Sequence, residues 1–178
     1  MTALPVPSDF EARTNATYEA LMWALSRPGL IRHMPDAGQA GVIEALLDRE
    51  CKVHCADPAL APIVARTGAA LVAPDSADHL FFNSLPDADT LGKINLGSDL
   101  YPETGATLVC NAALEQGARL RLSGPGCNGS IDVQVEGLSA GFWQNRVRLM
   151  RYPMGFELFL IDGAQVLGIP RSCQVEVL

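Results

Sequence analysis

The sequence predicts a single α/β domain with three layers built around a mixed β-sheet. In the first half of the chain, segments with helical periodicity alternate with short β-type segments, which is typical of α/β folds. In the second half, β-type segments follow one another with one further helix among them. The 178 residues contain no internal repeat and no linker long enough to separate domains. We therefore expect one domain over residues 1–178.

The first expected element is an amphipathic helix over residues 9–26. Ser8 and Glu11 have the spacing of a capping box, in which each residue satisfies a backbone N–H of the other. The helix ends at Arg27-Pro28-Gly29, because proline and glycine interrupt helical periodicity. The elements expected next are strands at 30–34, 52–55, 70–73 and 79–83, and helices at 39–49, 57–67 and 87–93.

The C-terminal quarter predicts a β-hairpin. Its first strand covers 156–161, and Asp162-Gly163 forms the turn because both residues tolerate positive φ. The second strand stops at Pro170, which cannot donate to a ladder and belongs at a strand end or sheet edge. Arg171 then projects where regular pairing ends, toward either a binding site or a carboxylate neighbour. Before the hairpin we expect strands at 106–112, 118–123 and 131–135 and a helix at 138–151.

Charge and composition exclude some classes of function. The net charge of −7 argues against general binding to nucleic acid or to an anionic membrane, which both need a broad basic surface. An anionic ligand would need a local cluster of positive charge. No apolar run approaches the ~20 residues of a membrane helix, and we see no signal peptide. With an odd number of cysteines, five, a reducing cytoplasm is the simplest interpretation.

One formal cofactor motif is not supported by its context. Gly124-Pro-Gly126-Cys-Asn-Gly129 has the G-x-G-x-x-G pattern, but a dinucleotide site requires this loop to open a helix. The chain continues with Ser-Ile-Asp-Val-Gln-Val, which alternates with period two and indicates a strand. We expect a hairpin connection here and no bound cofactor.

A metal site is not supported either. Cys51 and Cys55 on one strand would lie about 13 Å apart on the same face, while His54 would point to the other face. That geometry cannot close a tetrahedral site around one ion. We expect buried free cysteines beside an ordinary histidine, and no metal.

Four residues are candidates for contact with an anion or a partner: Arg171, Arg121, Arg119 and Glu103. Arg119 and Arg121 alternate with leucines, so both guanidinium groups lie on one face of a strand and need carboxylates or an anionic ligand. Surface salt bridges and a functional role are equal alternatives for this pair. Glu103 lies in a loop, where it could be a general base, although loop glutamates are usually solvated. No catalytic residue is identified.

A second basic cluster has a structural interpretation. Arg146, Arg148 and Arg151 crowd the C-terminus of the helix expected at 138–151. Positive side chains at this position offset the helix macrodipole. Contact with a partner is the second interpretation.

Short motifs distributed over the whole chain resemble one known family. The motifs are Tyr18–Gly29, Tyr101–Val109, Leu120–Gly126, Tyr152–Gly155, Gly168–Arg171 and Val175–Val177. In order and spacing they are similar to the H subunit of the bacterial carbon–phosphorus lyase system, the PhnH family. The resemblance implies a fold similar to a reduced transferase dependent on pyridoxal phosphate (PLP) that has lost the cofactor and its lysine. Lys52 and Lys93 are the two lysines of the chain and lie in no obvious cofactor motif.

The resemblance also implies a role and partners. The protein would be a homodimer-forming subunit of a core complex with the G, I and J subunits. The complex would form α-D-ribose 1-methylphosphonate 5-triphosphate from ATP and methylphosphonate, and this subunit would be non-catalytic or would share the activity, with possible contact to ATP or phosphonate. The alternatives are a free-standing small-molecule transferase or hydrolase, using Glu103, and a purely structural scaffold. We further expect the Arg171→Ala substitution to leave folding nearly unchanged while impairing growth on phosphonate.

Overall fold

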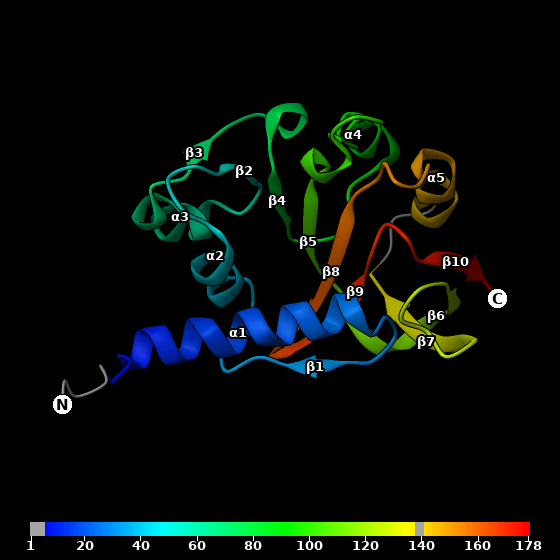
Figure 1. The fold of residues 1–178 in the computed structure, drawn as a ribbon, viewed down its shortest axis with the longest axis horizontal. Helices are drawn as coiled ribbons and strands as arrows, with labels where there is room; N and C mark the ends of the chain where they lie inside the picture. The colour runs from blue at the N-terminus through cyan, green and yellow to red at the C-terminus, as the bar shows by residue number, and fades with distance from the viewer. Residues whose placement is uncertain (1–5, 138–140) are drawn as a thin grey trace.

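The computed structural model describes residues 6–137 and 141–178, which form two β-sheets with helices packed against them (Figure 1). The helices are α1 (Asp9–Ser26), α2 (Ala40–Leu46), α3 (Ala61–Thr67), α4 (Ala88–Leu91) and α5 (Phe142–Leu149), with short 3₁₀ turns η1 (Pro58–Leu60), η2 (Pro74–Ser76) and η3 (Pro102–Thr104). The strands are β1 (Arg32–His33), β2 (Lys52–Cys55), β3 (Ala70–Leu71), β4 (His79–Phe82), β5 (Thr107–Asn111), β6 (Ala113–Ser123), β7 (Ser130–Glu136), β8 (Glu157–Asp162), β9 (Gln165–Ile169) and β10 (Gln174–Val177).

The larger sheet is mixed and has seven strands in the order β1-β9-β8-β5-β4-β2-β3. Adjacent strands are parallel throughout the series β3-β2-β4-β5-β8. Strand β9 runs antiparallel to both of its neighbours, β8 and β1. The smaller sheet is antiparallel, in the order β10-β6-β7. No helix in the described part of the chain is long and apolar enough to span a bilayer.

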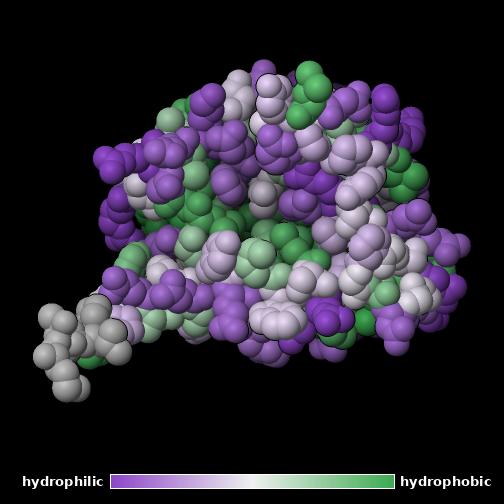
Figure 2. Space-filling view, in the orientation of Figure 1, coloured by the Kyte–Doolittle hydropathy of each residue, from purple (hydrophilic) through white to green (hydrophobic). Residues whose placement is uncertain are grey.

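Both faces of the larger sheet are covered, which gives the domain three layers. On one face, Phe159 and Ile161 of β8 pack with buried residues of α1, α2 and α3. On the other face, Leu158 and Leu160 pack with α4, α5 and the smaller sheet. A strand buried on both faces has an almost continuous apolar sequence, as β8 does. Figure 2 shows one side of the molecule, where apolar side chains gather in the concave middle above α1 and hydrophilic side chains surround them.

Helix α1 lies across the β8–β9 hairpin (Figure 1). Its N-terminus has the expected capping box between Ser8 and Glu11. Near its C-terminus the helix approaches β9 at Gly168, where a Cβ atom would lie 2.5 Å from the carbonyl carbon of Ala24. Real Cβ atoms do not come so close to backbone, so only glycine permits this approach.

The hairpin is present as predicted, but its turn lies one residue later than expected. Asp162 is the last residue of β8 and pairs with Gln165, so the two-residue turn is Gly163-Ala164, in which Gly163 has a φ of 55°. Pro170 follows the last residue of β9, as expected. The Gly124–Gly129 segment connects β6 to β7 within an antiparallel pair, as expected for a hairpin and not for a dinucleotide loop. The segment expected as one helix at 57–67 is a 3₁₀ turn followed by α3. Of the helix expected at 138–151, residues 138–140 lie outside the described residues.

The prediction of one mixed sheet was incomplete, because the segments 118–123 and 131–135 lie in the separate smaller sheet. Strand β6 alternates the buried Leu120 and Leu122 with the exposed Arg119 and the partly exposed Arg121, so only one of its faces is apolar. Such a strand does not suit the centre of the larger sheet, where β8 buries apolar side chains on both faces. Strand β10 was not predicted; it pairs with β6 and buries Val175.

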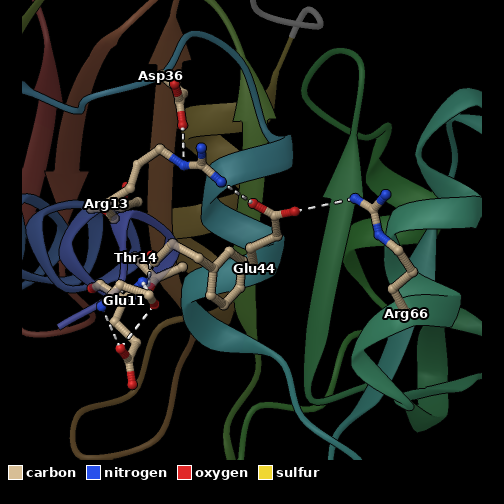
Figure 3. Close-up of polar contacts among 9 residues, drawn as sticks. Glu11, Arg13, Thr14, Asp36, Glu44 and Arg66 are labelled. Atoms are coloured by element: carbon tan, nitrogen blue, oxygen red, sulfur yellow. Dashed lines mark hydrogen bonds and ion pairs between the residues drawn. The ribbon is translucent and has the colours of Figure 1, made fainter.

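Ion pairs connect the three helices on one face of the sheet (Figure 3). Arg13 of α1 pairs with Asp36 at 2.9 Å and with Glu44 of α2 at 3.7 Å. Glu44 also accepts from Arg66 of α3 at 3.1 Å. Pairs this exposed contribute up to about 1 kcal/mol each, so the network supplements the apolar packing beneath it.

The Gly168→Ala substitution is expected to lower the free energy of unfolding by about 1–3 kcal/mol, because the methyl group overpacks the contact between β9 and α1. Gly41→Ala is the matched control: its Cβ atom would lie 3.7 Å from Thr17 Oγ1. In helix α2 this change should raise stability by about 0.5–1 kcal/mol. Urea denaturation measures both, and equal stabilities of the two variants would contradict the close approach.

Candidate functional site

Three connections meet at the amino ends of β5 and β8. They are the turn η3 that leads into β5, the segment that leads into β8, and the chain that follows β9. The backbone N–H of Gly155 donates to the carbonyl of Leu96 at 2.8 Å, which joins the first two connections. Three of the motif segments, Tyr101–Val109, Tyr152–Gly155 and Gly168–Arg171, therefore come together at one edge of the sheet.

Arg171 links these connections. Its Nε donates to Glu157 Oε1 at 2.6 Å, and its backbone N–H donates to the other oxygen of the same carboxylate at 2.8 Å. The guanidinium also donates to the carbonyl oxygens of Pro102 and Gly105. Only 14% of the Arg171 side chain is exposed. Of the two environments expected for Arg171, the structure therefore has the carboxylate neighbour.

Glycines make this arrangement possible. A Cβ atom at Gly105 would collide with the carbonyl oxygen of Gly155 and would lie 3.0 Å from Arg171 Nη1. Gly155 has a φ of 152°, and a Cβ atom there would collide with the sulfur of Met150. The glycines let the three backbones approach closely enough for one arginine to reach all of them.

A second arginine, Arg146 of α5, is buried beside this cluster. Its guanidinium donates to the carbonyls of Cys173 and Pro170 at 3.1 and 2.9 Å, and Nε has no partner. Burial lowers the pKa of Arg146 to about 10. Arg146 and Arg171 border a hollow of about 400 Å³ that also includes Tyr152.

The structure differs from the expectation that Arg146 offsets the dipole of its own helix. Phe142, Trp143 and Arg146 all face the core. The spacing i, i+1, i+4 places them on one helix face, so a basic residue in an apolar stripe was the sequence signal for burial. Arg148 and Arg151 are exposed and bond to Asn145 and Asp99 respectively.

Arg119 and Arg121 lie on one face of β6, as predicted, and share a single carboxylate. Arg121 donates to both oxygens of Asp132 on β7, at 2.8 and 3.1 Å, and Arg119 donates to one at 3.3 Å. The hydrogen bonds from Arg121 are the main cause that lowers the pKa of Asp132. Glu176 of β10 pairs with Arg121 in the ladder, and its charge also raises the pKa of Arg121. Two arginines and two carboxylates therefore lie together, and their formal charges balance. Arg119 and Asp132 also border a hollow of about 330 Å³.

The four candidate residues do not form one site. Glu103 is exposed in η3, the turn whose Pro102 carbonyl accepts from Arg171. Arg119 and Arg121 lie on the smaller sheet instead. Within residues 6–137 and 141–178, no group of three or more His, Cys, Asp or Glu side chains could hold a metal ion.

The opposite edge of the sheet also carries a polar contact that sequence reasoning missed. Gln39 is buried, and its amide donates to the carbonyl of Phe82 at 2.8 Å and to Asn111 Oδ1 at 3.0 Å. This is the carboxyl edge of the parallel strands, where ligands of open α/β sheets usually bind. The Arg171 cluster lies at the amino edge, which favours a structural or docking role for it over catalysis.

The contacts of Arg171 change the expectation that the Arg171→Ala protein folds nearly normally. The substitution should lower the free energy of unfolding by on the order of 2–4 kcal/mol, because Glu157 and two carbonyls lose a charged donor. Arg119→Ala, in an exposed pair, should cost less than about 1 kcal/mol. Denaturant unfolding compares the two variants, and a loss for Arg171→Ala no greater than that for Arg119→Ala would contradict the bracing role.

Substitution of Arg121 by Gln should raise the pKa of Asp132 toward its ordinary value, because the two strongest hydrogen bonds to the carboxylate are lost. Arg119→Gln should produce a smaller rise, since Arg119 makes one longer bond. Carbon NMR titration of the Asp132 carboxyl measures both. An equal rise in the two variants would show that Arg121 is not the dominant partner.

Comparison with known proteins confirms the resemblance seen in the motifs. Residues 8–176 match the family model described as bacterial phosphonate metabolism protein (PhnH). The chain is also 30% identical over 175 residues to the putative C-P lyase subunit protein HtxG of Stutzerimonas stutzeri. That alignment covers 93% of this chain and 87% of the relative. The chain therefore belongs to the PhnH family of bacterial phosphonate metabolism proteins.

Proposed function

We propose that this protein is a cytoplasmic subunit of a carbon–phosphorus lyase complex in phosphonate catabolism. The observation that carries the proposal is the family match over residues 8–176, which covers nearly the whole chain. The relative HtxG, which is named as a putative C-P lyase subunit, aligns with a similar share of the chain. In this proposal the protein assists formation of α-D-ribose 1-methylphosphonate 5-triphosphate from ATP and methylphosphonate, together with the G, I and J subunits.

The proposed role is non-catalytic or shared among subunits. We propose that the fold is a reduced form of a PLP-dependent transferase fold that has lost the cofactor and its lysine. The positions of the two lysines of the chain are compatible with this proposal. Lys52 is exposed at the start of β2, and Lys93 is exposed just after α4. Neither lies in the Arg171 cluster. The subunit would also form a homodimer.

Among the four candidate residues, Arg119 and Arg121 are the ones we propose for contact with an anion. Both are exposed, and their guanidinium groups together have more donors than the single Asp132 carboxylate can accept. ATP, phosphonate or an acidic surface of a sister subunit would contact these guanidinium groups. Arg171 makes hydrogen bonds inside the protein, so its proposed part is to hold the η3 turn and Glu103 where a partner could contact them.

A purely structural scaffold is the second candidate, and a specific observation favours it. Arg171 is the most buried of the three candidate arginines, and its guanidinium donates hydrogen bonds to Glu157 and to backbone carbonyls. Calorimetry distinguishes the two functions: heat on titration with ATP or methylphosphonate supports ligand contact, and its absence supports the scaffold.

Deletion of the gene should abolish growth on methylphosphonate as the sole phosphorus source, and the wild-type protein should restore growth. The double variant R119Q/R121Q should restore it poorly, because both guanidinium groups are lost. D132N, which keeps both arginines, is the matched control and should restore it well.

The tagged wild-type protein should co-purify with the G, I and J subunits. Normal growth of the deletion strain, or turnover of ATP and methylphosphonate by the isolated protein, would contradict the proposal.

A further inference from the structure

Helix α1 carries large apolar side chains on the side that faces away from the sheet. The inner side buries Thr17 and Leu21, among others. On the outer side, Tyr18 and Met22 are each 49% exposed, and Trp23 is 46% exposed. Neighbouring large apolar side chains on a surface helix typically mark an interaction site.

The surface beside these residues is hollowed and preformed. A hollow of about 460 Å³ lies between the C-terminal half of α1 and the β6–β7 turn, bordered by Trp23, Arg27 and Gly126. A second hollow of about 220 Å³ shares Arg27 and Gly126 and extends to Leu30. The turn is held against the helix, since a Cβ atom at Gly126 would lie only 2.5 Å from the carbonyl oxygen of Ser26.

Trp23 is held in position at the centre of this surface. The guanidinium of Arg32 on β1 lies 5.6 Å from the centroid of its ring, within the range of a cation–π contact. An exposed tryptophan that is already positioned loses little conformational freedom on binding. Such residues often carry much of the binding energy of an interface.

The charges around Trp23 are arranged symmetrically and with opposite sign. Glu19 lies four residues before Trp23 and Arg27 lies four residues after it, both bordering the larger hollow. Among the ion pairs of the described residues, none involves Glu19 or Arg27. Residues spaced by four form a ridge on the helix surface, and the commonest helix packing interdigitates two such ridges.

This arrangement is complementary to itself. If two copies of α1 cross in antiparallel directions with Trp23 at the two-fold axis, Glu19 of each copy faces Arg27 of the other. A two-fold interface must pair each residue reciprocally in this way. A different partner protein would place no such requirement on the charges to either side of Trp23, so the pattern favours a second copy of this chain.

We propose that two copies of this chain pair through the α1 patch, defined as Tyr18, Glu19, Met22, Trp23, Arg27 and Leu30. The apolar side chains form the centre of the interface, and the two Glu19–Arg27 pairs set its antiparallel register. The inference rests on the homodimer part of the proposed function and adds the surface that forms it.

Charge reversal tests the patch. E19R and R27E should each raise the dimer dissociation constant at least about tenfold, because each places two like-charged pairs across the axis. The double variant E19R/R27E restores opposite charges and should bring the constant back to within about threefold of the wild-type value. Sedimentation velocity over a concentration series measures all four proteins, with melting curves to establish that each is folded.

R49E and E50R are the matched controls, since they reverse the same charges on exposed residues between α2 and β2 and should leave dimerisation unchanged. A wild-type dimer that is insensitive to E19R and R27E, or a double variant as weak as the single ones, overturns the patch alone. A wild-type protein that stays monomeric at every concentration overturns the patch and the homodimer. Growth of the complemented deletion strain on methylphosphonate tests the subunit role separately, because it does not depend on which surface forms the dimer.

Discussion

The β8–β9 hairpin must be buried on both faces at once, and most of the architecture follows from this constraint. Alternate residues of β8 face the two apolar clusters, so neither side of the hairpin can be left to water. Helix α1 covers one face and approaches the sheet most closely at Gly168. The smaller sheet and α5 cover the other face, which explains why a domain of this length needs a second, half-apolar sheet.

Two arginines donate hydrogen bonds to backbone carbonyls near one end of the hairpin. Buried backbone carbonyls need hydrogen-bond donors. Arg171 and Arg146 donate to four carbonyls at the amino edge of the sheet, those of Pro102, Gly105, Pro170 and Cys173, of which Pro102 and Pro170 also accept from backbone N–H groups. A guanidinium has five N–H donors in a fixed plane, whereas an ammonium has three on a flexible stem. The chain contains eleven arginines and two lysines, and these two positions show a physical use of arginine.

The remaining exposed features suit a protein that works in an assembly. The Arg119–Arg121 pair is held to β7 by Asp132 and presents two guanidinium groups near the surface. The α1 patch lies on the outer side of the helix that covers the hairpin. The arginine cluster lies at the amino edge of the parallel strands and is occupied by internal contacts.

The sequence by itself determined the local structure, the mixed character of the fold and the family. Capping at Ser8, the hairpin turn at Gly163 and the stop at Pro170 depend on neighbouring residues, and the structure has all three, with the turn one residue later than predicted. The paired placement of Arg119 and Arg121 followed from the period of a strand. Only the tertiary structure decided the partners of Arg171, the burial of Arg146 and the division into two sheets. Those outcomes depend on contacts between residues far apart in sequence, such as Arg171 with Pro102, which local periodicity does not encode.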